Sequence, residues 1–203
     1  LSGQISGLVR DLQIQNLDAR LGNTKLALSG NLKGLPDTKK LWLDVQLKPL
    51  LTSRKELQTF LPKNTLPQAI RIPDWLALRG NVRGSLQNLA ARLHLQTTDG
   101  SVAIKGNLNE SGSAPTYTVT LVANRLHVGR ILKQEPFLGE LSGTFSATGR
   151  DFNPEKMAAD FHGIITRLDL NGYSYRDLTV LASANRGKYG ARVQIVDPNI
   201  AFD

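Results

Sequence analysis

The feature that most constrains the fold is internal repetition. A Leu-x-Gly tripeptide opens similar segments at residues 1–3, 78–80 and 141–143, and an Asp or Asn follows ten residues after each leucine. A second repeated segment makes Gly30 and Gly106 equivalent positions. Regular spacing of this kind is typical of stacked repeat architectures, whose long continuous surfaces usually bind rather than catalyse.

The repeats predict one continuous repeat region over residues 1–203 rather than separate globular domains. The approximate repeat units are residues 1–73, 74–138 and 139–203. Because the sequence begins at leucine rather than methionine and ends within the pattern, we expect it to be an internal fragment of a longer chain. The sequence has no signal peptide and no apolar run long enough to span a membrane.

Apolar and polar residues alternate along most of the chain, as in Leu76, Leu78 and Val82. Such alternation indicates strands with one dry face and one wet face. The dipeptides Asp99-Gly100 and Asn171-Gly172 are strong hairpin signals. The sequence therefore predicts an all-β fold with about twelve strands, in which consecutive strands pair antiparallel.

Two short helical inserts are predicted, at residues 50–61 and 127–133. In the first insert, Ser53 and Glu56 form a capping box, and Pro62 ends the helix. The inserts occupy equivalent places in the first two units, where a small helix would cover an open end or edge of the sheet.

Pairs of glycines four residues apart recur in the strands, for example Gly30/Gly34 and Gly80/Gly84. Glycine permits bends and bulges in strands, and its recurrence at one phase predicts that the whole sheet bends along one line. The result is an elongated, curled antiparallel sheet with a dry concave side. The predicted groove residues are Leu76, Leu78, Val82, Leu93, Leu95, Val102, Ile104, Val119, Leu121, Phe145, Phe161 and Ile165.

The chain is basic, with a formal net charge of +8 and no cysteine. Residues 1–73 carry 11 Lys or Arg against 5 Asp or Glu, a net charge of +6; residues 74–138 carry +3, and residues 139–203 carry −1. This gradient fits either an anionic partner or a solvated polar face whose cations protect the sheet edges. The lack of cysteine excludes disulfides and thiolate metal sites.

Catalytic motifs are missing from the sequence. His94, His127 and His162 stand alone, without the close spacing that metal ligation requires, and no phosphate-binding or nucleophile motif occurs. Tyr173 and Tyr175 share a strand face, a spacing more typical of sheet packing than of a nucleic-acid stacking platform. We therefore expect a protein that is not an enzyme, takes no metal or cofactor, and does not bind nucleic acid.

Two stretches resemble the repeat region of TamB/AsmA-like proteins: "PDWLALRGNVRGSLQNLAARLHLQTTDGSVAIKGNL" at residues 73–108 and "YSYRDLTVLASANRGKYGARVQIVDPNIAFD" at residues 173–203. The second is similar to the form in long TamB homologues of Bacteroidota. The resemblance implies the curled sheet known as a β-taco, with an apolar groove, in a periplasmic segment of a parent protein that is anchored in the inner membrane and reaches towards the outer membrane.

The resemblance also implies a role in outer-membrane biogenesis. Three hypotheses about the function stay open. The first is transport of phospholipids between membranes, with acyl chains as the partners of the groove. The second is a chaperone for outer-membrane β-barrel proteins, and the third is a structural spacer or adhesin segment. A fourth hypothesis, a β-solenoid enzyme acting on polysaccharide, needs a pair of carboxylates that comes together in space, and the sequence shows no such cluster.

Overall fold

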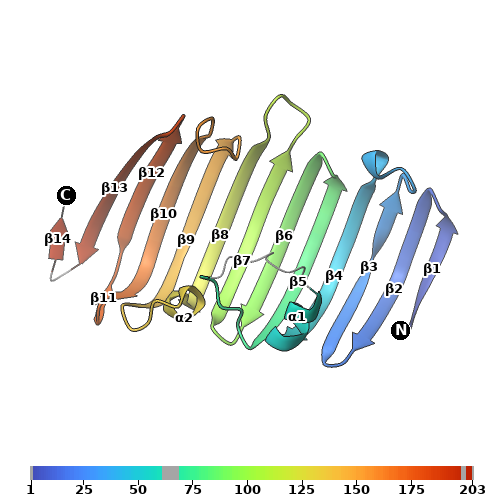
Figure 1. The fold of residues 1–203 in the computed structure, drawn as a ribbon, viewed down its shortest axis with the longest axis horizontal. Helices are drawn as coiled ribbons and strands as arrows, with labels where there is room; N and C mark the ends of the chain where they lie inside the picture. The colour runs from blue at the N-terminus through green and yellow to red at the C-terminus, as the bar shows by residue number, and fades with distance from the viewer. Residues whose placement is uncertain (1, 61–68, 198–199, 203) are drawn as a thin grey trace.

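The computed structural model describes residues 2–60, 69–197 and 200–202. It is one elongated, curled antiparallel β-sheet in which successive strands lie side by side in chain order, except that the short β11 pairs with β10 off the main path (Figure 1). The strands are β1 (Ser2–Leu8), β2 (Asp11–Leu21), β3 (Thr24–Lys33), β4 (Trp42–Ser53), β5 (Trp75–Ser85), β6 (Asn88–Thr97), β7 (Gly100–Asn109), β8 (Thr116–His127), β9 (Leu138–Arg150), β10 (Ala158–Leu170), β11 (Tyr173–Tyr175), β12 (Leu178–Asn185), β13 (Lys188–Asp197) and β14 (Ile200–Phe202). The predicted all-β fold is confirmed.

Within the residues that the structure describes, three short helical segments interrupt the strands: η1 (Thr38–Lys40), α1 (Arg54–Phe60) and α2 (Val128–Leu132). The helix predicted at 127–133 agrees with α2 to within a residue at each end. The helix predicted at 50–61 begins too early, because residues 50–52 continue β4 and pair with residues 76–78 of β5. Leu61 and Pro62, the predicted end of that helix, lie outside the described residues.

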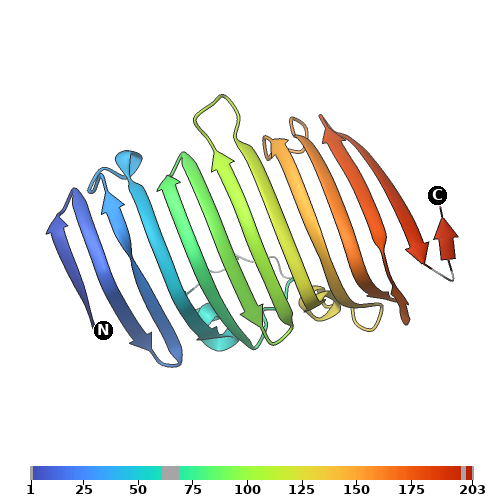
Figure 2. The same ribbon diagram turned by 180° about the vertical axis from the view of Figure 1, so that it is seen from behind.

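The predicted capping box at α1 is confirmed. The Ser53 hydroxyl accepts a hydrogen bond from the Glu56 backbone N–H at 3.4 Å, and its own contact with the Glu56 carboxylate is 3.3 Å. Both helices lie at the same end of the strands, where β4 and β8 finish, which we call the helix end. Both are on the near side of the sheet in Figure 1 and on the far side in Figure 2.

The predicted hairpins are also confirmed. Asn171 and Gly172 have φ values of 50° and 80°, the left-handed conformation that a two-residue turn between β10 and β11 requires. At the other site, Thr97 pairs with Gly100 to close the β6–β7 hairpin. The turns hold consecutive strands in register over nearly their full length.

The register places apolar residues of successive strands opposite one another. Directly paired residues share a face of the sheet, so each chain of pairs forms a line of side chains across the strands. One such line, from β4 to β12, is Leu50, Leu78, Leu95, Val102, Ala123, Gly143, Ile165 and Leu178. The sheet therefore has one continuous apolar face, and its other face is mostly polar.

The sheet is a single layer without an ordinary core. Its accessible surface is 13445 Å² for a chain of 22.2 kDa, against roughly 9,400 Å² for a compact protein of that mass. Among the described residues, no large side chain is less than 2% exposed. Within the described residues, nearly all contacts between elements join neighbouring strands, so most of the apolar face has no second layer over it.

Gly80 shows why glycine is needed where adjacent strands approach closely. It has a φ of +146°, and a Cβ at this position would lie 2.0 Å from the Arg92 carbonyl oxygen of β6. Gly30 is similar, with a φ of +150° and the Asp44 carbonyl oxygen at 2.1 Å. Gly106, the position that the repeat pattern makes equivalent to Gly30, would place a Cβ 3.5 Å from its nearest atom, so glycine is not required there.

Candidate functional site

The candidate site is the apolar face of the sheet. The register brings all twelve predicted groove residues onto this face. Leu78, Leu95, Val102 and Ile165 lie on the line described above, and Leu76 lies two residues from Leu78 on the same strand. A second line holds Leu93, Ile104, Leu121 and Phe145; a third holds Val82, Val119 and Phe161, with Ala91, Gly106 and Ala147 between them.

Exposure varies across the apolar face. Leu76, Val102 and Ile165, which lie towards the helix end, are at most 9% exposed. Phe161, near the beginning of β10, is 37% exposed and stacks on Phe145 with ring centroids 6.1 Å apart. The remaining predicted groove residues are half-buried. The face is thus an apolar surface that is partly exposed to solvent, and it is more deeply buried at the end where the helices lie.

The apolar face extends further than the predicted residues. Leu17, Leu28 and Leu47 continue the second line through β2, β3 and β4, and Val180 and Val193 continue it through β12 and β13. In β2 the register shifts between Ile14 and Leu17, which breaks the two-residue period that a prediction from sequence follows. In β3, by contrast, Leu26, Leu28 and Leu32 keep that period, so the signal was available there. The signal in β12 and β13 was present as simple alternation.

A network of ion pairs between side chains lies at the helix end, beside α2. The Asp99 side chain, 3% exposed, lies 3.2 Å from Arg71 and 3.6 Å from Arg130 of α2. Arg71 also contacts Asp74 at 3.1 Å, and its backbone N–H donates to the Ile131 carbonyl at 2.7 Å. These contacts join the β6–β7 turn, the segment before β5 and α2, so that the end of the apolar face is held by charged groups.

The Glu56 carboxylate connects α1 to the beginning of β3. It accepts hydrogen bonds from the Asn23 backbone N–H and from the hydroxyls of Thr24, at 2.9 Å, and Ser53. The Asn23 N–H is the main cause that lowers the pKa of Glu56 below its usual value of 4.5, with the two hydroxyls adding to it. Since Thr24 also contacts Thr52 at 2.8 Å, α1 is tied to both β3 and β4.

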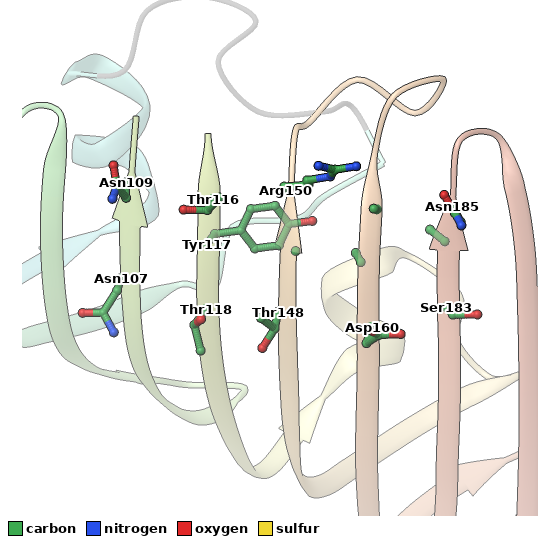
Figure 3. A pocket seen from close by; sticks show the side chains of 14 residues that line it. Asn107, Asn109, Thr116, Tyr117, Thr118, Thr148, Arg150, Asp160, Ser183 and Asn185 are labelled. Atoms are coloured by element: carbon green, nitrogen blue, oxygen red, sulfur yellow. The ribbon is translucent and has the colours of Figure 1, made fainter. Parts of the chain in front are cut away.

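The opposite face is polar and hollowed in several places. Figure 3 shows one hollow, of about 680 Å³, crossed by the polar side chains of Asn107, Thr118, Thr148, Asp160 and Ser183 from β7 to β12. His162 lines a neighbouring hollow, and His94 a third one between β4 and β8. The histidines stay apart, and the part of the chain that the structure describes holds no cluster of metal-ligating residues.

Tyr173 and Tyr175 contact each other edge to face, with ring centroids 4.7 Å apart, and both are half-buried. Their arrangement fits the sheet-packing interpretation of their spacing. They pair with Leu170 and Leu168 at the helix end of β10.

The chain matches no protein-family model, no curated protein and no solved structure. The resemblance to TamB/AsmA-like proteins therefore stays a prediction. None of the described helices has the length and apolar character needed to cross a membrane.

Proposed function

We propose that the apolar face binds the acyl chains of phospholipids, as one segment of a protein that moves lipids between two membranes. The observation that carries the proposal is the alignment of aliphatic side chains from consecutive strands on one uncovered face. In a soluble protein, an apolar patch much larger than a few hundred Å² marks a site of interaction. A face that continues across the strands provides a path rather than a single pocket.

The composition of the face suits hydrocarbon. Its three central lines hold Leu, Ile, Val, Ala, Gly and Phe, without a charged residue from β5 to β10. Burying an acyl chain of about 16 carbons yields roughly 13 kcal/mol at about 0.8 kcal/mol per methylene. The cost of ordering the lipid offsets part of this gain. Because no polar anchor fixes a chain in place, the same wall supports sliding from one strand to the next.

The exposure of the apolar face also argues against the alternative of a structural spacer. A spacer or adhesin segment would fill its dry face with its own side chains or a second layer of structure. The large accessible surface and the half-buried aliphatic residues favour a face that is completed by another molecule.

A chaperone for outer-membrane β-barrel proteins is the second candidate. Its supporting observation is the same continuous apolar face, which would take up the apolar side chains of an unfolded barrel strand. Crosslinking separates the two candidates, since a trapped client protein favours the chaperone and an acyl chain trapped on the apolar face favours transport.

The test compares two triple variants. Leu93→Asp, Val119→Asp and Phe161→Asp place charges on the apolar face, and binding of a fluorescent phospholipid should fall by roughly tenfold or more because each carboxylate must be desolvated. The matched control is Ile164→Asp, Leu181→Asp and Val196→Asp, which alters apolar residues of 49%, 45% and 74% exposure on the opposite face.

The control variant should bind lipid as the unmodified protein does. Circular dichroism and the urea midpoint establish that both variants are folded. Equal lipid binding by the two folded variants would contradict the proposed function.

A further inference from the structure

The polar face carries a cluster of cations between β4 and β7, around a hollow of about 530 Å³. We call this cluster the basic hollow, and it is formed by Lys48, Arg79, Arg92 and Lys105. All four residues are exposed. His94, Asn81 and Gln46 also line it. The hollow lies on the opposite side of the sheet from the proposed lipid surface, so what it binds is a separate question.

The register forces like charges together in the basic hollow. Arg92 of β6 pairs directly with Lys105 of β7, and Arg79 of β5 pairs with His94, two residues along β6 from Arg92. Directly opposed side chains on one face have Cβ atoms about 5 Å apart, and diagonal neighbours lie about 7–8 Å apart. Like charges in this arrangement repel, and the repulsion is relieved when an anion sits between them.

The sheet does not supply that anion. Elsewhere on the molecule several cations have carboxylate partners: Arg83 lies 3.6 Å from Asp44, and Arg125 and Arg167 share Glu140 at 3.7 and 3.9 Å. Among the described residues, by contrast, Arg79, Arg92 and Lys105 form no ion pair, and the residues lining the hollow include no Asp or Glu.

Lys48 has a neutral partner, since its Nζ donates to the Asn16 side-chain oxygen at 2.8 Å. The hollow in Figure 3 differs from the basic hollow, because Asp160 lines it together with Arg150. The excess of positive charge is thus local to β4–β7, in agreement with the charge gradient along the sequence.

We propose that the basic hollow binds a compact anion carrying more than one phosphate group. Arginine guanidinium groups bind phosphate oxygens with two parallel hydrogen bonds, and lysine adds a point charge. Three or four cations around one hollow of this volume match several clustered phosphates better than a single monoanion. Such phosphates occur both in a diphosphorylated lipid headgroup and in a soluble polyphosphate.

The test measures binding of inorganic triphosphate to the full chain by isothermal titration calorimetry. The triple variant Arg79→Gln, Arg92→Gln and Lys105→Gln should lose at least about tenfold in affinity, as expected when charge-assisted hydrogen bonds are removed. The matched control, Arg150→Gln, Lys156→Gln and Arg192→Gln, removes the same charge outside the basic hollow and should change affinity less than about twofold.

A parallel arm uses phosphatidylcholine vesicles with and without cardiolipin, a lipid with two phosphates. Binding of triphosphate alone identifies a soluble ligand, whereas binding of both probes with the same dependence on Arg79, Arg92 and Lys105 identifies a lipid headgroup. Failure to bind triphosphate, or an equal loss in both triple variants, overturns the proposal. Neither result bears on the acyl-chain proposal, whose test substitutions at Leu93, Val119 and Phe161 lie on the other face.

Discussion

Replacement of Gly80 by alanine tests whether the sheet depends on close approach of adjacent strands. In the native structure, an alanine Cβ at this position would lie 2.0 Å from the Arg92 carbonyl oxygen and 2.9 Å from the Leu93 Cα. Both neighbours are backbone atoms of β6, so relief requires β5 and β6 to separate. The φ of +146° is itself unfavourable for alanine.

The expected loss of stability follows from these two effects. A non-glycine residue held in such a backbone conformation costs about 1–3 kcal/mol, and displacement of the ladder adds to that figure. We therefore expect Gly80→Ala to lower stability by about 2–4 kcal/mol. Gly106→Ala is the matched control, since its Cβ would meet the Thr118 carbonyl oxygen at 3.5 Å and its backbone is ordinary. Its effect should lie within about 1 kcal/mol of zero.

Urea unfolding followed by circular dichroism measures both variants, with the midpoint compared at equal slope. Because Gly80 of β5 and Gly106 of β7 flank β6 and lie on one face of the sheet, their surroundings differ mainly in backbone approach. A Gly80→Ala midpoint equal to that of Gly106→Ala would refute the reasoning, and so would a Gly106→Ala variant that is the less stable of the two.

Two further predictions concern the helix end. Asp99→Asn removes the carboxylate shared by Arg71 and Arg130 and should destabilise the protein by about 1–3 kcal/mol in urea unfolding. The control Asp74→Asn changes a side chain that is 64% exposed and should cost less than about 1 kcal/mol. Similar losses of stability in the two variants would contradict the idea that burial strengthens the ion pairs of Asp99. The pKa of Glu56 is lower in the folded protein than its usual value of 4.5. Its carboxylate therefore stabilises the fold above that pH, and the contribution disappears as the pH falls through the folded pKa. Glu56→Gln should lower the urea midpoint at pH 7 and have progressively less effect on it below pH 4.5. The effect of the exposed control Glu155→Gln on the midpoint should not depend on pH in this way. An effect of Glu56→Gln that is the same at pH 7 and below pH 4.5 would contradict the stabilising role of the Glu56 carboxylate.

The sequence was sufficient to predict the strand faces wherever strict alternation persists. From β5 to β10, alternation alone places Leu93, Ile104 and Leu121 on one face, because the side-chain period of a strand is two. It was insufficient where a bulge adds residues, as between Leu47 and Leu50 of β4. There the phase changes, and the leucines at positions 47, 50 and 51 resemble the beginning of a helical stripe.

The need for glycine could be predicted only as a repeated pattern. The sequence makes Gly30 and Gly106 equivalent, yet only Gly30 approaches the carbonyl oxygen of its neighbouring strand. Likewise, the basic hollow depends on cross-strand pairing of Arg92 with Lys105, thirteen positions apart along the chain. Net charge along the sequence indicated an excess of cations in the first two units but not their convergence on one face.

Site-specific photocrosslinking with a phospholipid that carries a diazirine at the end of its acyl chain tests the central claim most directly. We expect labelling at Leu93, Ile104, Leu121 and Phe145, which lie on the apolar face of the four consecutive strands β6 to β9. We also expect little labelling at Thr120 and Val122, which alternate with Leu121 on the polar face of β8. Equal labelling of the two faces of β8, or labelling confined to the polar face, would contradict the claim.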